Sequence, residues 1–441
     1  MTEQAVVLKG GQVVDPAQGI SGTADVRIEN GRVAAVGVDL PVDGAAPVEV
    51  PAGLVVCPGF IDMHVHFREP GQEHKETIAT GAAAAVAGGF VAAACMPNTD
   101  PVNDHVGVTG EIVRKAAEAG LARVYPIGAV SIGSKGERMT EVRALREAGC
   151  VGISDDGHPV ASALMMRRAL EYASMFDMPV INHCEEPSLA AGGVVHEGYR
   201  AAALGLRGMP GETESIMVER DVSLSGLTGG SFHVAHMSAR QSLRAVQSGK
   251  ERGVAVTCEV TPHHFILTDE DLQYDTNFKM NPPLRAVADR DAMLEGLADG
   301  SIDAIATDHA PHHADEKAVE FDRAPFGIIG LETAVSLSLD RLVHRDVLGL
   351  SRLVELYAPN PARILGVGGG SLTPGSAADL TVLAPDTFVE VSADRFRSKA
   401  RNTPFDGWRL RGAVAATIVG GRLVYTNDAV PAARALTLPA Q

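Results

Sequence analysis

Two histidines, one residue apart, end the first strongly apolar run of the chain. His64 and His66 lie within the segment 62–68, which reads DMHVHFR. Because the side chains of a β-strand alternate between its two faces, both imidazoles point to the same side. Two imidazoles at this spacing suit one metal ion, but a pair of core or surface histidines would show the same pattern. The motif alone leaves both interpretations open.

Further polar residues end other apolar runs of the chain. They are Ser154-Asp155-Asp156-Gly157, Asn182-His183-Cys184-Glu185, Val234-Ala235-His236-Met237 and Ala306-Thr307-Asp308-His309. An ionised carboxylate beside a hydrophobic strand is unfavourable unless it is paired or bound to a metal. Imidazole and carboxylate together match zinc and also suit other divalent transition metals. Four histidines and two aspartates at these positions make six candidate ligands. One tetrahedral site with an open position holds fewer, so we expect two ions that share a bridging carboxylate.

The elements that must position these residues form an alternating pattern. Runs of β-forming residues alternate with helical patterns such as 108–119, 161–174 and 239–247. The eight predicted strands are 54–67, 90–96, 123–130, 151–154, 179–184, 231–236, 254–260 and 304–307. Eight strand–helix units fit an α/β fold of the (β/α)8 TIM-barrel type, in which working residues gather where strands end and loops begin. A doubly wound open sheet is the alternative, but no glycine-rich dinucleotide motif opens these helices.

Both ends of the chain predict short strands joined by tight turns. Asn30-Gly31 separates two such strands and favours a two-residue hairpin, and Gly420-Gly421 separates two others. The strand candidates are 6–8, 13–14, 25–28, 33–36, 379–383, 415–419 and 422–425. We therefore expect one small β-sandwich domain built from residues 1–56 and 366–441, with the barrel at 57–365.

Composition excludes several classes of protein. Hydrophobic residues make up 45% and charged residues 21%, which excludes wholesale disorder. The net charge of −17, without any Lys/Arg-rich run, argues against a nucleic-acid or anionic-membrane surface. No secretory signal opens the chain, and the most apolar window, 82–96, is too short to span a bilayer. Five scattered cysteines indicate free thiols, so a cytoplasmic location is expected.

Several of these motifs resemble one family. The segment 62–71 closely resembles the first-strand signature of dihydroorotases, which belong to the cyclic-amidohydrolase superfamily. Further similar motifs follow in order: Met96-Pro97-Asn98-Thr99, Ser154-Asp155-Asp156-Gly157, His183-Cys184-Glu185, His236-Met237-Ser238, 280–285, 307–312, Pro325-Phe326-Gly327 and 374–380. The resemblance covers nearly the whole chain. It implies zinc-dependent, reversible cyclisation of N-carbamoyl-L-aspartate to dihydroorotate in pyrimidine biosynthesis.

The resemblance also implies how the metal ligands are shared. It places His64, His66 and Asp308 on one Zn²⁺, and His183 and His236 on the other, two ions per subunit. Related hydantoinases bridge such ions with a carboxylated lysine, but residues 150–159 contain no lysine. The family motif favours Asp156 over Asp155 as the bridge. Asp308 is the expected catalytic residue, taking a proton from the attacking water and passing it to the leaving nitrogen.

A carboxylate on the substrate requires cationic and hydrogen-bonding partners. Arg68 can present a bidentate fork to it, and the family pattern assigns Asn98 and His312 to the same carboxylate. The complete predicted substrate-binding set is His66, Phe67, Arg68, Asn98, Asn281, His312, Phe326 and Gly327. His263 and His264 match no ligand position and are interpreted as structural. The charged stretch 311–325 is either a lid or a solvated loop.

Two alternatives remain beside a dihydroorotase. A hydantoinase or allantoinase would act on a neutral ring, which the missing lysine and the predicted carboxylate pocket disfavour. A catalytically dead structural partner of aspartate transcarbamoylase should have lost metal ligands, whereas every expected ligand type is present. A homodimer is expected, and association with aspartate transcarbamoylase follows by family analogy only. The expected ligand is a small molecule, with neither nucleic acid nor membrane as a partner.

Overall fold

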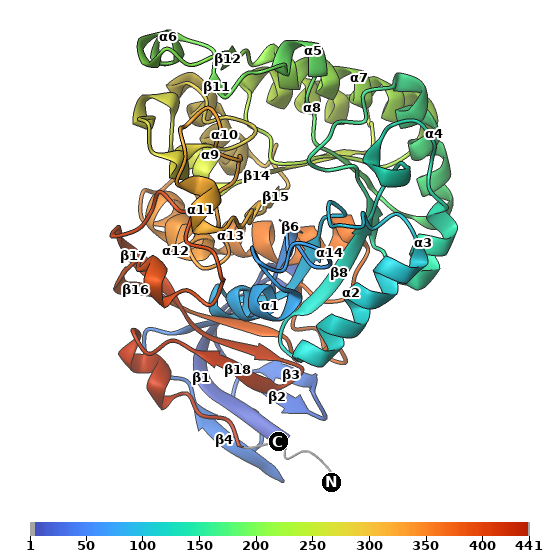
Figure 1. Cartoon of the computed structure of the whole chain (residues 1–441). Coiled ribbons are helices and arrows are strands. Elements are labelled where there is room, and N and C mark those ends of the chain that lie inside the picture. The colour runs from blue at the N-terminus through green and yellow to red at the C-terminus, as the bar shows by residue number, and fades with distance from the viewer. Residues whose placement is uncertain (1–4, 440–441) are drawn as a thin grey trace.

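A barrel of parallel strands occupies the middle of the chain in this computed structural model, which describes residues 5–439 (Figure 1). Neighbouring strands pair in sequence order from β6 to β15. The strands are β6 (Phe60–Val65), β7 (Phe90–Cys95), β8 (Arg123–Gly128), β9 (Gly152–Ile153), β10 (Val180–Asn182), β13 (Phe232–Val234), β14 (Val256–Val260) and β15 (Ala304–Ile305). A parallel bridge between Val65 and His309 joins the last strand's extension to the first. The predicted (β/α)8 barrel is confirmed.

Helices follow the barrel strands; the longer ones cover the outside of the barrel and short ones lie in its loops (Figure 1). They are α1 (Ile78–Ala87), α2 (Val106–Ala119), α3 (Val142–Ala148), α4 (Ala163–Ala173), α5 (Pro187–Ala190), α6 (Tyr199–Leu204), α7 (Glu212–Thr228), α8 (Arg240–Glu251), α9 (Pro262–Ile266), α10 (Val287–Asp299), α11 (Ala314–Lys317), α12 (Ala334–Ser338), α13 (Leu350–Tyr357) and α14 (Pro359–Leu365). Two short strands, β11 (Val195–His196) and β12 (Gly208–Met209), pair in a loop. Within residues 5–439, no helix is long and apolar enough to cross a membrane.

Both chain ends build a second sheet of eight strands, seen as blue and red arrows below the barrel (Figure 1). Its strands are β1 (Ala5–Asp15), β2 (Ile20–Glu29), β3 (Arg32–Gly37), β4 (Ala45–Glu49), β5 (Val55–Pro58), β16 (Leu380–Glu390), β17 (Arg409–Val419) and β18 (Arg422–Thr426). Leu8 and Val26 share one hydrophobic core with Leu380 and Ile418. Asn30 and Gly31 adopt the positive φ angles of the predicted hairpin. The domain boundaries stay a prediction.

One predicted strand is two strands. The run 54–67 divides at Gly59 into β5, which pairs with β1 and β16, and β6, which begins the barrel. Gly59 donates its N–H to Asp379 O (2.8 Å), and a Cβ there would lie 2.4 Å from a Val91 methyl. The close approach requires glycine, so the chain turns there from one sheet into the other. The strand that carries His64 is therefore joined directly to the second sheet.

A third hydrophobic cluster joins the C-terminal part of the chain to the barrel loops. Phe405 and Leu410 pack there with Leu284 and Phe321, which belong to loops on the barrel. All four side chains are buried. The segment before β17 is thus fixed against the barrel by apolar packing.

Candidate metal centre

The predicted metal ligands meet at the carboxyl end of the barrel strands. His64 lies in β6 and His66 just beyond it, while the others follow β9, β10, β13 and β15. All six side chains are buried: His64, His66, Asp156, His183, His236 and Asp308. A TIM barrel collects its working residues at this end. The structure brings together the complete set that the sequence predicts.

Two ligand clusters share His64, and Asp156 of the second cluster also faces the first. The ligand atoms of His64, His66 and Asp308 lie within 4.8 Å of one another, and so do those of His64, Asp156 and His236. Asp156 lies between them: Oδ2 is 3.4 Å from His66 Nε2 and Oδ1 is 3.5 Å from His236 Nε2. His183 Nδ1 lies 2.9 Å from His236 Nε2. This central position of Asp156 suits a carboxylate that bridges two cations.

Several polar atoms of this cluster are buried without a hydrogen-bond partner in the described residues. His64 Nε2 and Asp156 Oδ1 are two of them, 3.4 Å apart. Buried polar atoms are hydrogen-bonded in nearly all structures, so these two require another partner. Two imidazole-rich clusters around a carboxylate have the donor chemistry that divalent zinc prefers. The residues present therefore fit the metal that the sequence predicts.

Glu259, which sequence reasoning missed, orients His64. Its Oε1 accepts a hydrogen bond from His64 Nδ1 (2.8 Å), which directs Nε2 of the same ring at the ligand cluster. Its other oxygen lies 3.3 Å from His233 Nε2. Burial alone would raise the pKa of Glu259, but the hydrogen bonds from His233 and His64 outweigh it and lower the pKa to about 2. The detectable signal was a glutamate inside a buried strand, β14.

Asn98 orients His66 in the same way. Asn98 Oδ1 accepts from His66 Nδ1 (2.9 Å), so His66 Nε2 faces Asp308 Oδ1 at 3.0 Å. This arrangement leaves the amide N–H groups of Asn98 for the neighbouring cavity, which Asn98 lines. Asn98 therefore touches both the metal cluster and the space for a ligand.

Asp155 and Asp156 have different surroundings. Asp155 accepts hydrogen bonds from the backbone N–H (2.9 Å) and hydroxyl (2.5 Å) of Ser131. Asp156 instead faces His64, His66 and His236. Alternation along the chain turns only one of the two carboxylates inward, and that one is Asp156.

Three site residues have backbone angles that side-chain-bearing residues rarely adopt. The φ angles are +63° at Arg68, +32° at His236 and +45° at Asp308. Such conformations are unfavourable by roughly 1–3 kcal/mol each and concentrate at functional sites. Two of these residues are predicted metal ligands and the third is the predicted substrate-binding arginine, which indicates that the fold aims these side chains at the site.

A cavity of about 320 Å³ opens beside the ligand cluster. The predicted substrate-binding residues that line it are His66, Arg68, Asn98, Asn281, His312, Phe326 and Gly327. Asn281 also donates to Glu185 Oε2 (2.8 Å) next to His183. The ring of Phe67 is buried against Gly81 of α1, where a Cβ would lie 2.4 Å from that ring. Any ligand contact by Phe67 is therefore through its backbone and stays a prediction.

Arg68 is a buried cation on the wall of this cavity. Its Nε donates to Pro311 O (3.2 Å), and among residues 5–439 no carboxylate forms an ion pair with it. Burial lowers the pKa of the guanidinium to about 10, with Asp308 and Asp156 opposing the change. Arg68 is thus protonated at neutral pH, and its remaining N–H groups suit an anionic ligand.

His312 and Gly327 lie against each other at the cavity mouth. His312 Nε2 donates to Phe326 O (2.8 Å), which leaves Nδ1 without a hydrogen-bond partner in the described part of the chain. A Cβ on Gly327 would lie 2.7 Å from Ala310 O and 2.9 Å from the His312 ring, and φ is +148°. Only glycine fits this position, so Gly327 allows the two loops to close on each other.

One lysine tethers the charged loop 311–325 from outside, and a second lysine closes a contact within the loop. Lys279 Nζ donates to Phe321 O (2.8 Å) and Asp322 O (3.0 Å), and Lys317 Nζ donates to Pro325 O (2.9 Å). Burial lowers the pKa of Lys317 to about 7. The loop carries helix α11 and is anchored to the chain outside it by Lys279. Its role as a lid stays a prediction.

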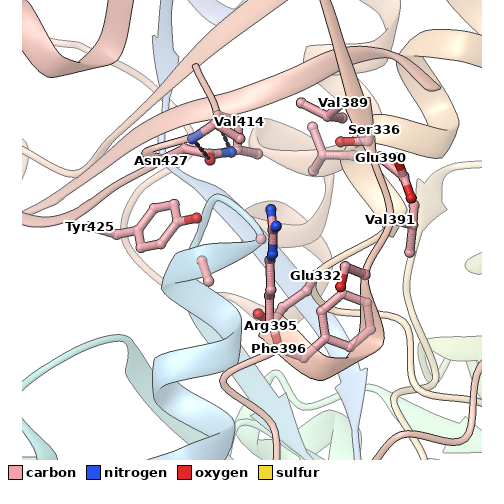
Figure 2. Close-up of a pocket in the computed structure, with 15 residues that line it drawn as sticks. Glu332, Ser336, Val389, Glu390, Val391, Arg395, Phe396, Val414, Tyr425 and Asn427 are labelled. Atoms are coloured by element: carbon pink, nitrogen blue, oxygen red, sulfur yellow. Dashed lines mark hydrogen bonds between the residues drawn. The ribbon is translucent and has the colours of Figure 1, made fainter. Parts of the chain in front are cut away.

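His264 and a second cavity lie outside the predicted site. His264 is held between Thr261 Oγ1 (2.7 Å) and Pro282 O (2.9 Å), which is a structural arrangement, and the adjacent His263 is buried. Figure 2 shows a second cavity, of about 130 Å³, between the barrel and the second sheet. Its Glu332 accepts hydrogen bonds from the backbone N–H groups of Arg397 and Ser398. None of the predicted site residues lines it.

Sequence comparison identifies the family of the chain. Residues 53–242 match the family described as Dihydro-orotase-like. The chain is 51% identical to the dihydroorotase of Geobacter metallireducens over 95% of this chain and 99% of the relative. It is 53% identical to that of Anaeromyxobacter dehalogenans, over 96% and 98%. The chain belongs to the dihydroorotase family.

Solved structures with the same architecture come from a neighbouring group. The L-hydantoinase (dihydropyrimidinase) from Arthrobacter aurescens has a TM-score of 0.85 at 25% identity, over 97% of this chain and 96% of that one. The dihydropyrimidinase from Brevibacillus agri has a TM-score of 0.82 at 22% identity, over 96% and 95%. These structures share the fold of this dihydroorotase family member. The hydantoinase alternative is thus supported by a distant likeness only.

Proposed function

We propose that the protein is a metal-dependent dihydroorotase that interconverts N-carbamoyl-L-aspartate and (S)-dihydroorotate in pyrimidine biosynthesis. Two Zn²⁺ ions are the proposed cofactors: His64, His66 and Asp308 would hold one ion, His183 and His236 would hold the other, and Asp156 would be the shared ligand. Zinc bound there supplies positive charge that acidifies water and polarises an amide carbonyl. The predicted homodimer, the aspartate transcarbamoylase association and the cytoplasmic location stay predictions.

One observation carries the choice of substrate. Arg68 is a buried cation without an ion-pair partner in the described chain, and it lines the same cavity as Asp308. A buried unpaired charge is unfavourable, so the cavity is built to receive an anion. Dihydroorotate carries a carboxylate, whereas dihydrouracil and allantoin do not. The arginine therefore favours dihydroorotate over the neutral rings.

The chain's own residues have distinct roles in ring opening. Arg68, the Asn98 amide and His312 bind the substrate carboxylate. Burial and the neighbouring charge of Arg68 lower the pKa of His312 to about 3, and an incoming anion opposes that shift. Asn281 binds the ring. Asp308 accepts a proton from the water that attacks the ring amide carbon; the carbon–nitrogen bond then breaks and Asp308 returns the proton to the leaving nitrogen. Cyclisation runs through the same steps in reverse and releases water.

Ring opening of dihydroorotate by the purified protein tests this proposal. Activity should disappear after treatment with a chelator and return when Zn²⁺ is added back, because the buried donors need the cation. Metal content measured in the same samples should follow the activity, reaching two ions per chain. Activity that persists in metal-free protein would contradict the metal assignment, and inactivity of zinc-loaded protein would contradict the proposed function.

A further inference from the structure

We propose that Asn402, on the C-terminal segment 396–402, is a positioning residue that fixes the substrate-binding mouth of the barrel. The inference rests on the proposed function and extends it to a residue from the part of the chain that follows the barrel. Asn402 holds His312 and Gly327 in place without lining the cavity itself. It determines how tightly the carboxylate-bearing substrate binds.

Asn402 bonds to four points of the mouth. Its Nδ2 donates to Ala310 O (3.0 Å) and Gly327 O (3.0 Å), and its Oδ1 accepts from the His312 N–H (3.1 Å). Its backbone carbonyl accepts from the Ile329 N–H (3.0 Å). The side chain is buried, with both amide donors and its acceptor in use. One amide thus clamps the two strands of chain that face each other across the mouth.

The segment that carries Asn402 is itself anchored. Glu332 accepts from the backbone N–H groups of Arg397 (2.9 Å) and Ser398 (3.1 Å) at the start of the segment, beside the cavity of Figure 2. The Ser398 hydroxyl donates to the buried Glu76, whose Oε2 lies 3.5 Å from His309 Nε2. His309 directly follows Asp308. These contacts therefore fix the position of the segment relative to Asp308, which follows β15.

Apolar packing fixes the segment's other end. Phe405, three residues after Asn402, is buried in the cluster that contains Leu284 and Phe321 of the barrel loops. Asn402 is therefore held between a polar anchor at 397–398 and an apolar anchor at 405. A rigid amide held in this way reduces the conformational freedom of the mouth before substrate arrives.

This rigidity has a definite consequence for binding. Without the Asn402 amide, Ala310 O and Gly327 O lose their donor and the His312 N–H loses its acceptor. His312 and Gly327 then become ordered only on binding, which weakens affinity for the substrate. The metal ligands keep all their contacts, because none of them hydrogen-bonds to Asn402. The expected effect is therefore on KM rather than on metal content.

Kinetics of the zinc-loaded, full-length protein test the inference. Asn402→Ala should raise KM for dihydroorotate about tenfold or more, while kcat falls much less and metal content is unchanged. Asn402→Ser, which retains one hydroxyl, should have an intermediate effect. The control is Asn427→Ala: Asn427 also clamps backbone, donating to Val414 O (2.9 Å) and accepting from the Ala429 N–H (3.0 Å), but it lines the cavity of Figure 2 and not the substrate cavity. It should leave KM unchanged.

The outcomes separate this inference from the proposed function. Wild-type protein without activity on dihydroorotate would overturn the proposed function and this inference with it. Active wild type with an unchanged KM in Asn402→Ala would overturn only this inference. Loss of folding in both Asn402 variants, while Asn427→Ala folds, would assign Asn402 a purely structural role and also overturn it. A raised KM with full metal content supports the positioning role.

Discussion

Replacing Asp308 with asparagine should lower kcat for ring opening of dihydroorotate by about 10²- to 10⁴-fold, because the amide cannot accept and return a proton. Asp308 is buried 3.0 Å from His66 Nε2, and the positive φ at this position holds it toward the cluster. Asparagine tolerates positive φ and has the same shape, so the variant should remain folded. Steady-state kinetics beside thermal unfolding measure both properties.

A surface variant provides the matched control for this loss. Asp315→Asn makes the same change on the charged loop 311–325, where the side chain is 92% exposed. It should leave kcat within about twofold, since surface substitutions rarely disturb a folded site. Metal content distinguishes lost proton transfer from a lost ligand. Turnover close to wild type in zinc-loaded Asp308→Asn would refute the catalytic role of Asp308.

Replacing Arg68 with methionine should raise KM for dihydroorotate by roughly 10- to 150-fold, the equivalent of about 1.5–3 kcal/mol for a hydrogen bond to a charged group. The methionine removes a buried cation that forms no ion pair in the described chain. Thermal stability should therefore be maintained or increase, although the change lies in the core of the site. Kinetics and thermal unfolding of one preparation test both the expected rise in KM and the expected maintained or higher thermal stability.

Arg323→Met is the control for Arg68→Met. Arg323 lies on the charged loop 311–325 with its side chain 74% exposed, and its ion pair is with Glu320, three residues away. Its removal should change neither KM nor stability measurably. An unchanged KM in Arg68→Met, or a KM raised equally in both variants, would contradict a specific carboxylate contact. The comparison also separates a local contact from a general effect of net charge.

The barrel and the clustering of the predicted ligands at one end of it could be predicted because the necessary signals are local. His64 and His66 are two residues apart, so in a strand they face the same side. The other predicted ligands end apolar runs that all finish at one end of a parallel barrel: Asp156, His183, His236 and Asp308. Choosing Asp156 over Asp155 needed the family motif. The structure gives the physical reason, because Ser131 binds the Asp155 carboxylate. The division of 54–67 at Gly59 was also indicated locally, by Pro58-Gly59.

The residues that sequence reasoning missed act across long separations. Glu259 contacts His64 from 195 residues away, and Asn402 contacts His312 from 90 residues away. Hydrophobic periodicity and local composition describe only residues within a short stretch of sequence. Neither contact therefore produces a recognisable sequence pattern. A glutamate within the apolar strand 254–260 was a detectable anomaly, since a buried charge requires a partner. Asn402 had no such signal, because an asparagine between two turns is ordinary loop chemistry.

The ratio of kcat/KM for dihydroorotate to kcat/KM for dihydrouracil, in zinc-loaded wild-type protein, tests the central claim most directly. The two rings differ by the carboxylate that Arg68, Asn98 and His312 are proposed to bind. A site built to bind a charged group rejects a ligand that lacks it, so we expect a preference for dihydroorotate of at least about 10³-fold. Comparable activity on both rings, or a preference for dihydrouracil, would contradict the carboxylate pocket and favour a hydantoinase-like enzyme.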